Sequence, residues 1–327
     1  MKISVAVITY NQQETIAQTL DSILCQRGDF QLEVVVGEDC STDNTRAICQ
    51  EYAMRYPEQL VLLDNKQNMG IMRNFANTIK RCTGDMIAIC AGDDYWCDEK
   101  KLQKQKDFLD ANPQYGVCTT NGFRYLVRRN EMMEGLAPWN PVKDGDVKPF
   151  YFSPDYQGGV YAMPLIMLFR RELLQYIDFD TFIARGFPVE DYPMQAIMAQ
   201  HTLWGHIADK TVVYRVYSES ATFISYDHPK YMTYHRGLTE IRKYLEELYP
   251  GQTGYTQEWA EEYVFYREYL MYLHYGNFRK AKQLVEACTL HTPKVNKARK
   301  MTANRLVFQL FRCYKELSIK NDLKQRT

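Results

Sequence analysis

The sequence has no excess of charge of either sign, because its 40 Lys and Arg residues balance 40 Asp and Glu residues. Proteins that bind nucleic acid through its phosphates need a basic surface, so the overall charge gives no support for a nucleic-acid partner. The chain also lacks a long apolar run, since its longest candidate, residues 161–169, is far shorter than the roughly 20 residues that span a bilayer. No signal peptide is visible. We therefore expect a cytoplasmic protein without a transmembrane helix.

The nine cysteines are scattered along the chain, and none belongs to a C-x-x-C pair. The six histidines form no cluster at the spacing of metal ligands. A zinc site is therefore disfavoured, and free thiols in a reducing compartment are the simplest interpretation. A fixed-period repeat and a low-complexity segment are also missing, which excludes a solenoid.

The first third of the chain alternates regularly between two patterns. Short runs rich in β-branched residues predict buried strands at 3–11, 32–39, 59–65 and 85–94. Segments with helical spacing of apolar residues lie between them, at 13–26, 41–56 and 70–84. Such alternation builds a mostly parallel sheet flanked by helices, so we predict an α/β, Rossmann-like fold. Ligands of these folds bind beyond the carboxyl ends of the strands.

The alternation loosens from about residue 115. The pattern predicts a bent strand at 115–127, core segments at 162–173 and 193–201, and a further strand at 210–220. Residues 138–154 contain several prolines and read as a loop, which we expect to cover a site.

From about residue 226 the chain reads as helical. Two helices, 259–275 and 278–288, are predicted to form an αα-hairpin joined at Gly276-Asn277. We therefore divide the chain into a main domain, 1–225, with parts 1–115 and 116–225, and a helical extension, 226–327.

Pairs of acidic residues stand out at the ends of the predicted strands. Glu38–Asp39 ends the second strand and Asp93–Asp94 ends the fourth, while Glu190–Asp191 lies later, in "GFPVEDYPM". The carboxyl ends of parallel strands meet at one edge of a sheet, so we expect the first two pairs to face one cleft.

Two adjacent carboxylates need a partner between them. Like charges about 4 Å apart repel by several kcal/mol at intermediate dielectric. A divalent cation such as Mg²⁺ or Mn²⁺ removes that cost, because hard cations prefer oxygen ligands, and sugar hydroxyls do so as well. The alternative is that Gly92-Asp93-Asp94 is a solvated turn, since this tripeptide suits turns.

Five segments, in order, resemble glycosyltransferase family 2, whose members have the GT-A type of nucleotide-sugar-binding fold. They are "ISVAVITYNQQETIAQTLDSIL", "VVVGEDCSTDNT", "NKQNMGIMRNFANTIKRCTGDMIAICAGDDYW", "PVEDYPM" and "VVYRVYSES". The resemblance covers roughly residues 2–225. It implies a GT-A glycosyltransferase domain there, with 1–115 binding the nucleotide sugar and 116–225 on the acceptor side.

The resemblance also implies roles for individual residues. The donor-binding residues would be Thr9, Tyr10, Asn11, Asp39, Arg73 and Asp93. Of these, Asp39 would accept the N3–H of a nucleobase expected to be uracil, Arg73 would approach the diphosphate, and Asp93 would bind the ribose hydroxyls. The metal, Mg²⁺ or Mn²⁺, would bind Asp94, and Asp191 would be the catalytic base.

Other residues carry alternative interpretations. Glu190 is a second candidate base, Glu38 is a further acid of the donor loop, and Arg215 is a candidate for the diphosphate or for an ion pair at a strand edge. Trp96 either stacks on the sugar or belongs to the core. The alternative role of Asp191 is to cap a helix. Arg73 has a solvated alternative, and His201 and His206 are expected to be structural.

The sequence departs from the family pattern at four positions. Ala91 stands where an acid is common, so metal binding would rest mainly on Asp94. Cys40 replaces a usual Gly, Glu38 a usual Asp, and Tyr217 a His of many members.

The implied function is inverting transfer of a sugar from a nucleotide diphosphate, expected to be a UDP-sugar, to a hydroxyl of a glycan or lipid-linked acceptor. Surface polysaccharide or lipopolysaccharide assembly is the implied process. Two alternatives stay open. A sugar nucleotidyltransferase would need a Gly-rich, Arg-bearing loop after the first strand, which "ITYNQQET" lacks, and an inactive nucleotide-sugar binder is suggested by Ala91.

The C-terminal segment from Lys294 is basic, with ten Lys or Arg residues against Glu316 and Asp322. Its helical apolar positions are Leu306, Val307, Leu310, Phe311, Tyr314 and Leu317. Such a helix either contacts an anionic membrane peripherally, on its inner face, or packs on the catalytic domain.

Overall fold

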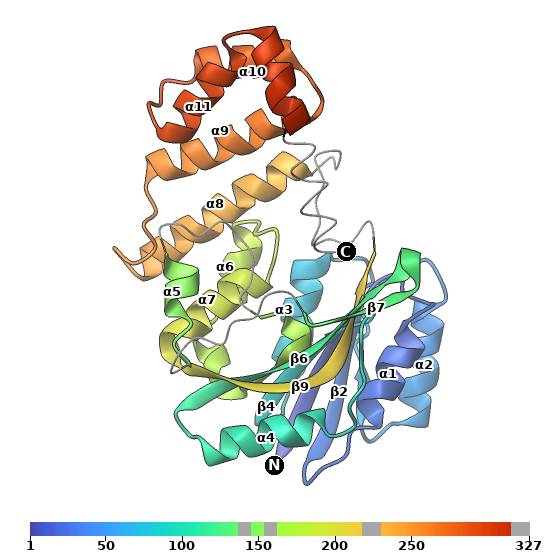
Figure 1. Ribbon diagram of the computed structural model, residues 1–327. Helices are drawn as coiled ribbons and strands as arrows, with labels where there is room; N and C mark the ends of the chain where they lie inside the picture. The colour runs from blue at the N-terminus through green and yellow to red at the C-terminus, as the bar shows by residue number, and fades with distance from the viewer. Residues whose placement is uncertain (137–144, 154–161, 218–229, 315–327) are drawn as a thin grey trace. The chain divides into compact units, whose positions relative to one another are not determined.

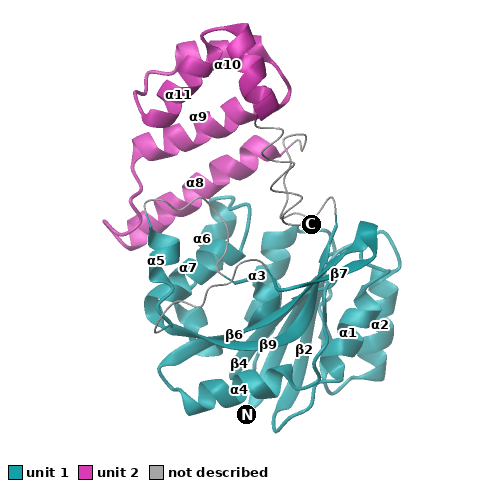
Figure 2. Cartoon of the chain, in the orientation of Figure 1, with its two compact units in different colours: residues 1–220 teal, residues 221–327 magenta. Residues whose placement is uncertain are grey.

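A computed structural model describes residues 1–136, 145–153, 162–217 and 230–314. The chain divides into two compact units, residues 1–220 (unit 1) and 221–327 (unit 2), which are coloured separately in Figure 2. The domain boundary that we expected at residue 225 lies outside the described residues.

Unit 1 is built on a nine-stranded mixed sheet with the order β3-β2-β1-β4-β8-β6-β9-β5, and β7 pairs with β6. Strands β3, β2, β1 and β4 are parallel to one another, and β6 is parallel to β9. The strands are β1 Lys2–Thr9, β2 Gln31–Glu38, β3 Leu60–Leu62, β4 Met86–Ala91, β5 Tyr95–Trp96, β6 Tyr115–Leu126, β7 Glu131–Glu134, β8 Met167–Arg170 and β9 Leu203–Val216.

Helices cover this sheet, and Figure 1 shows α1 and α2 on one side of the parallel strands and α3 on the other. The helices of unit 1 are α1 Ile16–Leu24, α2 Thr45–Arg55, α3 Ile71–Arg81, α4 Lys101–Ala111, α5 Lys148–Phe152, α6 Phe179–Ala184 and α7 Asp191–His201. Short 3₁₀ segments span Val127–Arg129, Pro164–Ile166 and Arg171–Tyr176. The α/β, GT-A-like fold predicted from the sequence is thereby confirmed.

Burial explains why the first strands carry so few polar residues. In β1, Ile3, Val5 and Val7 are fully buried, because helices cover both faces of a parallel sheet. Strand β6 bends through register shifts between Thr119 and Gly122, as the sequence predicted. The prediction of a loop at 138–154 is wrong for the part of that range that the structure describes, because Lys148–Phe152 forms α5. This helix has a proline in its first turn, where proline is tolerated.

Unit 2 is helical, as predicted. Its helices are α8 Tyr231–Leu248, α9 Gln257–His274, α10 Phe278–Ala287 and α11 Pro293–Thr302, followed by helical residues 305–314. Helices α9 and α10 form the expected hairpin. Gly276 takes the left-handed conformation, at φ +65°, and the Asn277 side chain caps α10. Among the described residues, no helix is both long and apolar enough to cross a membrane.

Candidate active site

Glu38, the last residue of β2, has a carboxylate that binds other groups of the protein. Glu38 is fully buried, and its Oε2 lies 3.1 Å from Nη1 of Arg46. Its Oε1 accepts a hydrogen bond from the Ser41 amide at 2.6 Å. These contacts fix the shape of the loop, so Glu38 has the geometry of a structural residue.

Asp39 connects the end of β2 to the start of α3. Its two carboxylate oxygens accept the amide hydrogens of Met69, at 2.8 Å, and Gly70, at 2.9 Å. Its own amide donates to the carbonyl of Thr9 at 3.1 Å. Each carboxylate oxygen can accept a second hydrogen bond, so the predicted contact with a nucleobase is still possible in stereochemical terms. Because Asp39 binds the amides of Met69 and Gly70, it also positions the start of α3 and therefore Arg73 in its first turn.

The loop after β1 is held against the acidic loop. Oδ1 of Asn11 accepts the Thr42 amide at 2.8 Å, and the Asn11 amide donates to Oγ of Ser41 at 2.9 Å. Asn11 and Cys40 both take left-handed conformations, at φ +52° and +56°. This explains why a glycine suits the position of Cys40. Tyr10 is 45% exposed at this edge, where its ring is free to contact a ligand.

The acid pair after β4 follows a glycine that has no room for a side chain. A Cβ atom on Gly92 would lie 2.5 Å from Oε1 of Gln12 and 2.6 Å from Oγ1 of Thr9. The hydroxyl of Thr19 donates to the carbonyls of Gly92, at 3.0 Å, and Asp94, at 2.6 Å. The turn that carries the two acids is therefore packed tightly against the end of β1, the loop after it and helix α1.

Arg215, at the end of β9, organises both acids. Its backbone amide donates to Oδ1 of Asp94 at 2.8 Å, and its Nη1 donates to the Asp93 carbonyl at 2.5 Å. Its Nη2 donates to the Gln18 side chain, and its guanidinium lies 4.7 Å from the ring centroid of Tyr95. The guanidinium thus binds a carbonyl and an amide. Of the two alternatives for Arg215, the ion pair at a strand edge is not among its contacts with the described residues, and the contact with a diphosphate stays a prediction.

The electrostatics of this pair favour a cation. Burial raises the pKa of Asp93, and burial together with the charge of Asp93 raises the pKa of Asp94 well above its ordinary value. The charge of Arg215 opposes both shifts but balances only one carboxylate. No donor within the described ranges reaches the second oxygen of Asp94. That oxygen is therefore suitably placed to bind a hard cation.

The residues present fit a metal that takes most of its coordinating oxygens from a bound nucleotide and from water. Among the described residues, no group of three or more His, Cys, Asp or Glu side chains could hold an ion. Magnesium and manganese sites of nucleotide enzymes often use one or two carboxylates, with phosphate and water oxygens completing the shell. Asp94 supplies one carboxylate, and Ala91 supplies none.

Two neighbours of the acid pair were not predicted as site residues. Burial raises the pKa of Asp93 and the Gln12 side chain opposes that shift, while Oε1 of Gln12 accepts the Thr9 hydroxyl at 2.8 Å. Burial raises the pKa of the Tyr217 phenol, and the charges of Asp93 and Asp94 raise it further. Two sequence signals point to Tyr217: it stands where many family members have a His, and it lies two residues after Arg215, just beyond the end of β9. Gln12 gave no such signal.

The late acid pair starts helix α7. Oδ1 of Asp191 accepts the Tyr192 amide at 2.7 Å. Asp191 is the first residue of α7, and Glu190 takes the cap position without a side-chain cap hydrogen bond, so the helix-cap alternative for Asp191 is not what the geometry shows. Both acids are half-buried. Burial and the charge of Asp191 raise the pKa of Glu190, and burial raises the pKa of Asp191. In the part of the chain that the structure describes, no hydrogen bond or ion pair joins Asp191 to Asp39, Asp93 or Asp94.

The remaining candidates divide into exposed and structural residues. Arg73 is exposed in the first turn of α3 and has no ion pair within the described residues. Trp96 is 3% exposed, with the Lys101 ammonium 4.5 Å from its ring centroid, which agrees with the core alternative. His201 stacks on Tyr176 at 3.6 Å, and His206 lies 3.1 Å from the Thr119 hydroxyl, so both have structural contacts.

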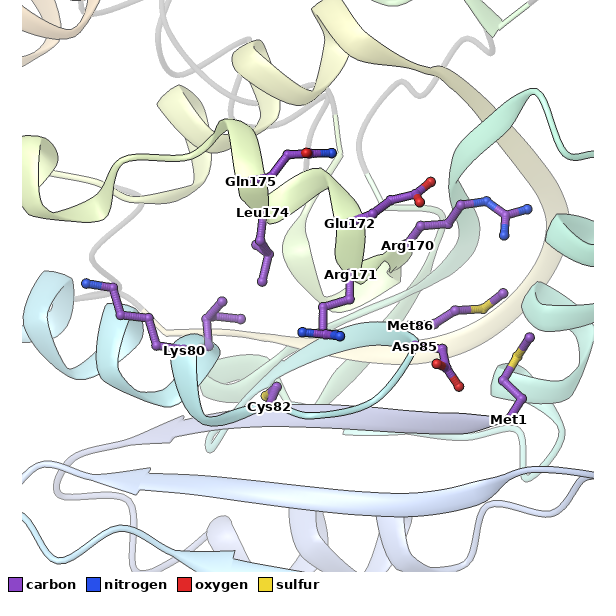
Figure 3. A pocket seen from close by; sticks show the side chains of 11 residues that line it. Met1, Lys80, Cys82, Asp85, Met86, Arg170, Arg171, Glu172, Leu174 and Gln175 are labelled. Atoms are coloured by element: carbon purple, nitrogen blue, oxygen red, sulfur yellow. The ribbon is translucent and has the colours of Figure 1, made fainter.

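A cavity of about 640 Å³ lies elsewhere in unit 1. Figure 3 shows the side chains that line it. Its lining includes Met1, Asp85 and Met86, which lie at the amino ends of β1 and β4. The acid pairs follow the carboxyl ends of the parallel strands, at the opposite edge of the sheet. The cavity is therefore separate from the candidate active site.

Comparisons with known proteins agree with this fold. Residues 4–177 match Glycosyl transferase family 2. An uncharacterized protein of Mycobacterium tuberculosis is 41% identical over 248 residues, which is 74% of this chain but 63% of the relative. The chain thus spans less than two thirds of that relative's length. Since the family match covers more than half of the chain, the protein belongs to glycosyltransferase family 2.

Solved structures show the same fold at low sequence identity. The structure of S. aureus TarS 1–349 in complex with UDP-GlcNAc has a TM-score of 0.53 and 15% identity, covering 100% of this chain and 93% of that one. Mannosyltransferase PcManGT from Pyrobaculum calidifontis, in complex with GDP-Man and Mn²⁺, has a TM-score of 0.52 and 18% identity, covering 97% and 87%. At this identity the likeness concerns the fold alone.

Proposed function

We propose that the protein transfers a sugar from a nucleoside diphosphate donor, expected to be a UDP-sugar, to a hydroxyl of a glycan or lipid-linked acceptor, with inversion at the anomeric carbon. The observation that carries the proposal is the pair Asp93–Asp94, which is buried at the carboxyl edge of the sheet and fixed by Arg215. Two acids share the single charge of Arg215, so a cation that binds Asp94 would favour ionisation of both carboxyl groups, which suits a metal-bound diphosphate beside a ribose.

Each half of the donor has matching groups in this proposal. Tyr10 and Thr9 border the base and ribose, Asp39 accepts the N3–H of the base, and Asp93 accepts the ribose hydroxyls. Asp94 holds Mg²⁺ or Mn²⁺, and Arg73 reaches the diphosphate from the first turn of α3. A bound metal would neutralise charge that develops on the leaving diphosphate. Binding of both substrates in line supplies a large entropic contribution to the rate.

Asp191 is the proposed base. It takes the proton from the acceptor hydroxyl as that oxygen forms its bond to the anomeric carbon and the bond from that carbon to the diphosphate breaks. A raised pKa favours this role, because a carboxylate is a better base when its pKa approaches the working pH. Glu190, with its own raised pKa, is the alternative base.

Ala91 supports a second candidate function, an inactive nucleotide-sugar binder, because an acid is missing where the family commonly has one. Turnover separates the two functions. An enzyme releases nucleoside diphosphate from its donor in the presence of Mn²⁺, even slowly and with water as acceptor. A binder is stabilised by the donor but releases nothing.

We also propose that unit 2 contacts the inner face of an anionic membrane. Phe308 and Phe311 of helical residues 305–314 are buried in the core of unit 2. The same stretch exposes large apolar side chains, Leu306 at 67%, Leu310 at 63% and Tyr314 at 66%. Exposed apolar residues next to basic ones suit peripheral binding to anionic lipid, which would bring the enzyme to a lipid-linked acceptor of surface polysaccharide assembly.

A thermal-shift screen of nucleotide sugars with Mg²⁺ and Mn²⁺ tests the proposal. Selective binding raises the melting temperature by mass action, so one donor should stand out and its effect should depend on the metal. If no nucleotide sugar stabilises the protein, the donor assignment is wrong.

A further inference from the structure

Lys101, the first residue of α4, is fully buried. Its Nζ donates to Oε1 of Gln105 at 2.7 Å, and the ammonium lies 4.5 Å from the ring centroid of Trp96. Within the described residues, no carboxylate forms an ion pair with it. Burial of an ammonium without a counter-charge costs free energy, and the face of an aromatic ring recovers only part of that cost. Stability alone would therefore favour an apolar residue at this position.

Gln105 fixes the ammonium in its place. The Nε2 group of Gln105 donates to the carbonyls of Cys118, at 2.7 Å, and Ile166, at 2.9 Å. A carbonyl only accepts hydrogen bonds, so the NH₂ group must face these two carbonyls and the amide oxygen must face Lys101. Gln105 is itself fully buried. The ammonium is therefore held against the Trp96 ring by a side chain that cannot turn away.

Trp96 belongs to β5, the two-residue strand that follows the acid pair. This strand pairs with β9, which carries Arg215. Successive side chains of a strand point to opposite faces, so Trp96 and Tyr95 point in opposite directions. Lys101 contacts the ring of Trp96, and the guanidinium of Arg215 lies 4.7 Å from the ring centroid of Tyr95. Each side chain of β5 therefore contacts a cation.

The backbone of β5 connects the acid turn to two other elements. The Trp96 amide donates to Oγ of Ser22 in α1 at 3.0 Å, and the Cys97 amide donates to the carbonyl of Thr211 in β9 at 2.9 Å. A movement of β5 would disturb the acid pair that precedes it and the strand that carries Arg215. A site that is already ordered before its ligand arrives loses less free energy on binding. Contacts that fix β5 therefore favour binding at the acid pair.

We propose that Lys101 is a positioning residue for the donor site, whose buried ammonium holds the Trp96 ring and thereby fixes β5 between the acid turn and β9. The inference rests on the proposed function, since it takes the acid pair and Arg215 to form the donor site. Lys101 acts through Trp96 and touches neither the donor nor the metal. Its contribution is order in the site before the donor binds.

The test compares nucleotide affinity in matched variants by calorimetric titration. The probe is the nucleoside diphosphate among UDP, GDP and ADP that most stabilises the wild type, together with Mn²⁺. Lys101→Met keeps the length of the side chain and removes its charge, and we expect affinity to fall about fivefold or more because a desolvated cation–π contact is lost. Lys100→Met removes an equal charge from the exposed neighbouring side chain and should bind as wild type does. Burial lowers the pKa of Lys101 to about 7, so the titrations are made at pH 6, where its ammonium form predominates.

Thermal unfolding of the same variants distinguishes a positioning role from a merely structural one. Lys101→Met should unfold at the same temperature as wild type or at a higher one, because the cost of burying an ammonium disappears together with its contacts. A merely structural residue would lower the melting temperature when it is replaced. A lower melting temperature in Lys101→Met, or an unchanged nucleotide affinity, would overturn the inference.

A second background tests whether Lys101 acts through Trp96. Phenylalanine binds a cation more weakly than tryptophan does, so Lys101→Met should reduce affinity less in Trp96→Phe than in wild type. An equal reduction in the two backgrounds would show that Trp96 does not transmit the effect, and would contradict the proposal.

Arg215→Met separates failure of this inference from failure of the proposed function. If Arg215→Met weakens binding while Lys101→Met does not, or if Lys100→Met weakens it as much as Lys101→Met, the positioning role is wrong and the donor site stands. If neither Arg215→Met nor Lys101→Met changes affinity, the location of the donor site is wrong as well.

Discussion

The backbone amide of Arg215 donates to Oδ1 of Asp94 at 2.8 Å, across 121 positions of the chain. The end of β9 is thereby tied to the turn after β4. Because the Arg215 side chain also holds the Asp93 carbonyl, one residue orders both acids of the candidate active site. The shape of the donor site therefore depends on a contact between segments that are far apart in the sequence.

Arg215→Met should weaken nucleotide binding and destabilise the protein, because it removes two hydrogen bonds and a positive charge that opposes the raised pKa values of the two acids. The backbone bond to Asp94 survives the change. Each hydrogen bond from a charged group contributes about 1.5–3 kcal/mol. Calorimetric titration with nucleotide and thermal unfolding measure the two effects. Arg128→Met, at an exposed position, should change neither.

Asp191→Asn should abolish transfer and leave donor affinity unchanged, since the proposed base acts on the acceptor alone. Glu190→Gln is the matched control and should retain most activity. Loss of donor binding in Asp191→Asn, or greater loss of activity in Glu190→Gln, would contradict the assignment.

The pH dependence of transfer provides a separate test of the base. A base works only when deprotonated, so the rate should rise with pH through its pKa. Because burial raises the pKa of Asp191, this acidic limb should lie at higher pH than the ordinary aspartate value of about 4. Single-turnover rates between pH 4.5 and 8.5 would locate it. A flat profile over that range would contradict the proposed role.

Asp94→Asn should stabilise the metal-free protein at neutral pH. The pKa of Asp94 is raised in the folded state, so its ionised form opposes folding, and stability from this group is lost as pH rises through that pKa. The gain should be of the order of 1 kcal/mol, or roughly 2–4 °C, at pH 8 and should shrink at pH 5. Thermal unfolding at both values measures it.

Asp98→Asn is the control of opposite sign for that experiment. Against the effect of burial, the hydrogen bond from Lys104 lowers the pKa of Asp98, so its loss should destabilise the protein at neutral pH. If the two variants changed the melting temperature by the same amount and in the same direction, ionised Asp94 would not oppose folding.

Asp39→Asn should loosen the start of α3. The carboxylate accepts two amides, and an asparagine would turn an NH₂ group toward one of them, at a cost of about 1–3 kcal/mol. Hydrogen exchange at Met69 and Gly70 should become faster. Asp64→Asn, at an exposed position near the same loop, should leave both amides protected, and unchanged exchange in Asp39→Asn would be inconsistent with the structure.

The proposed membrane contact predicts that serine at Leu306, Leu310 and Tyr314 reduces flotation with vesicles containing anionic lipid. These side chains are exposed, so the core residue Phe308 stays in place and unit 2 should remain folded. Vesicles of zwitterionic lipid alone should bind wild type weakly. Met54→Ser removes an exposed apolar residue elsewhere and is the control. Equal flotation of all variants would exclude this surface.

The sequence predicted the fold because strand and helix patterns in the first third are local. The positions of Asp39 and Asp94 at one edge followed from the parallel arrangement of strands. The contacts of these residues did not follow. Asp39 accepts two amides from the start of α3, and Arg215 contacts Asp93, Asp94 and Gln18. These contacts join distant segments, and no local pattern encodes them. Helix α5 was missed because its proline read as a loop signal, although proline is tolerated in a first turn.

Manganese binding measured by electron paramagnetic resonance tests the central claim most directly. Free Mn²⁺ is titrated with wild type and with Asp94→Asn, in the presence and absence of the nucleoside diphosphate that stabilises the wild type. The account predicts that wild type removes free Mn²⁺ beyond what the nucleotide alone does, and that Asp94→Asn does not. Equal uptake of Mn²⁺ by the two proteins would contradict it.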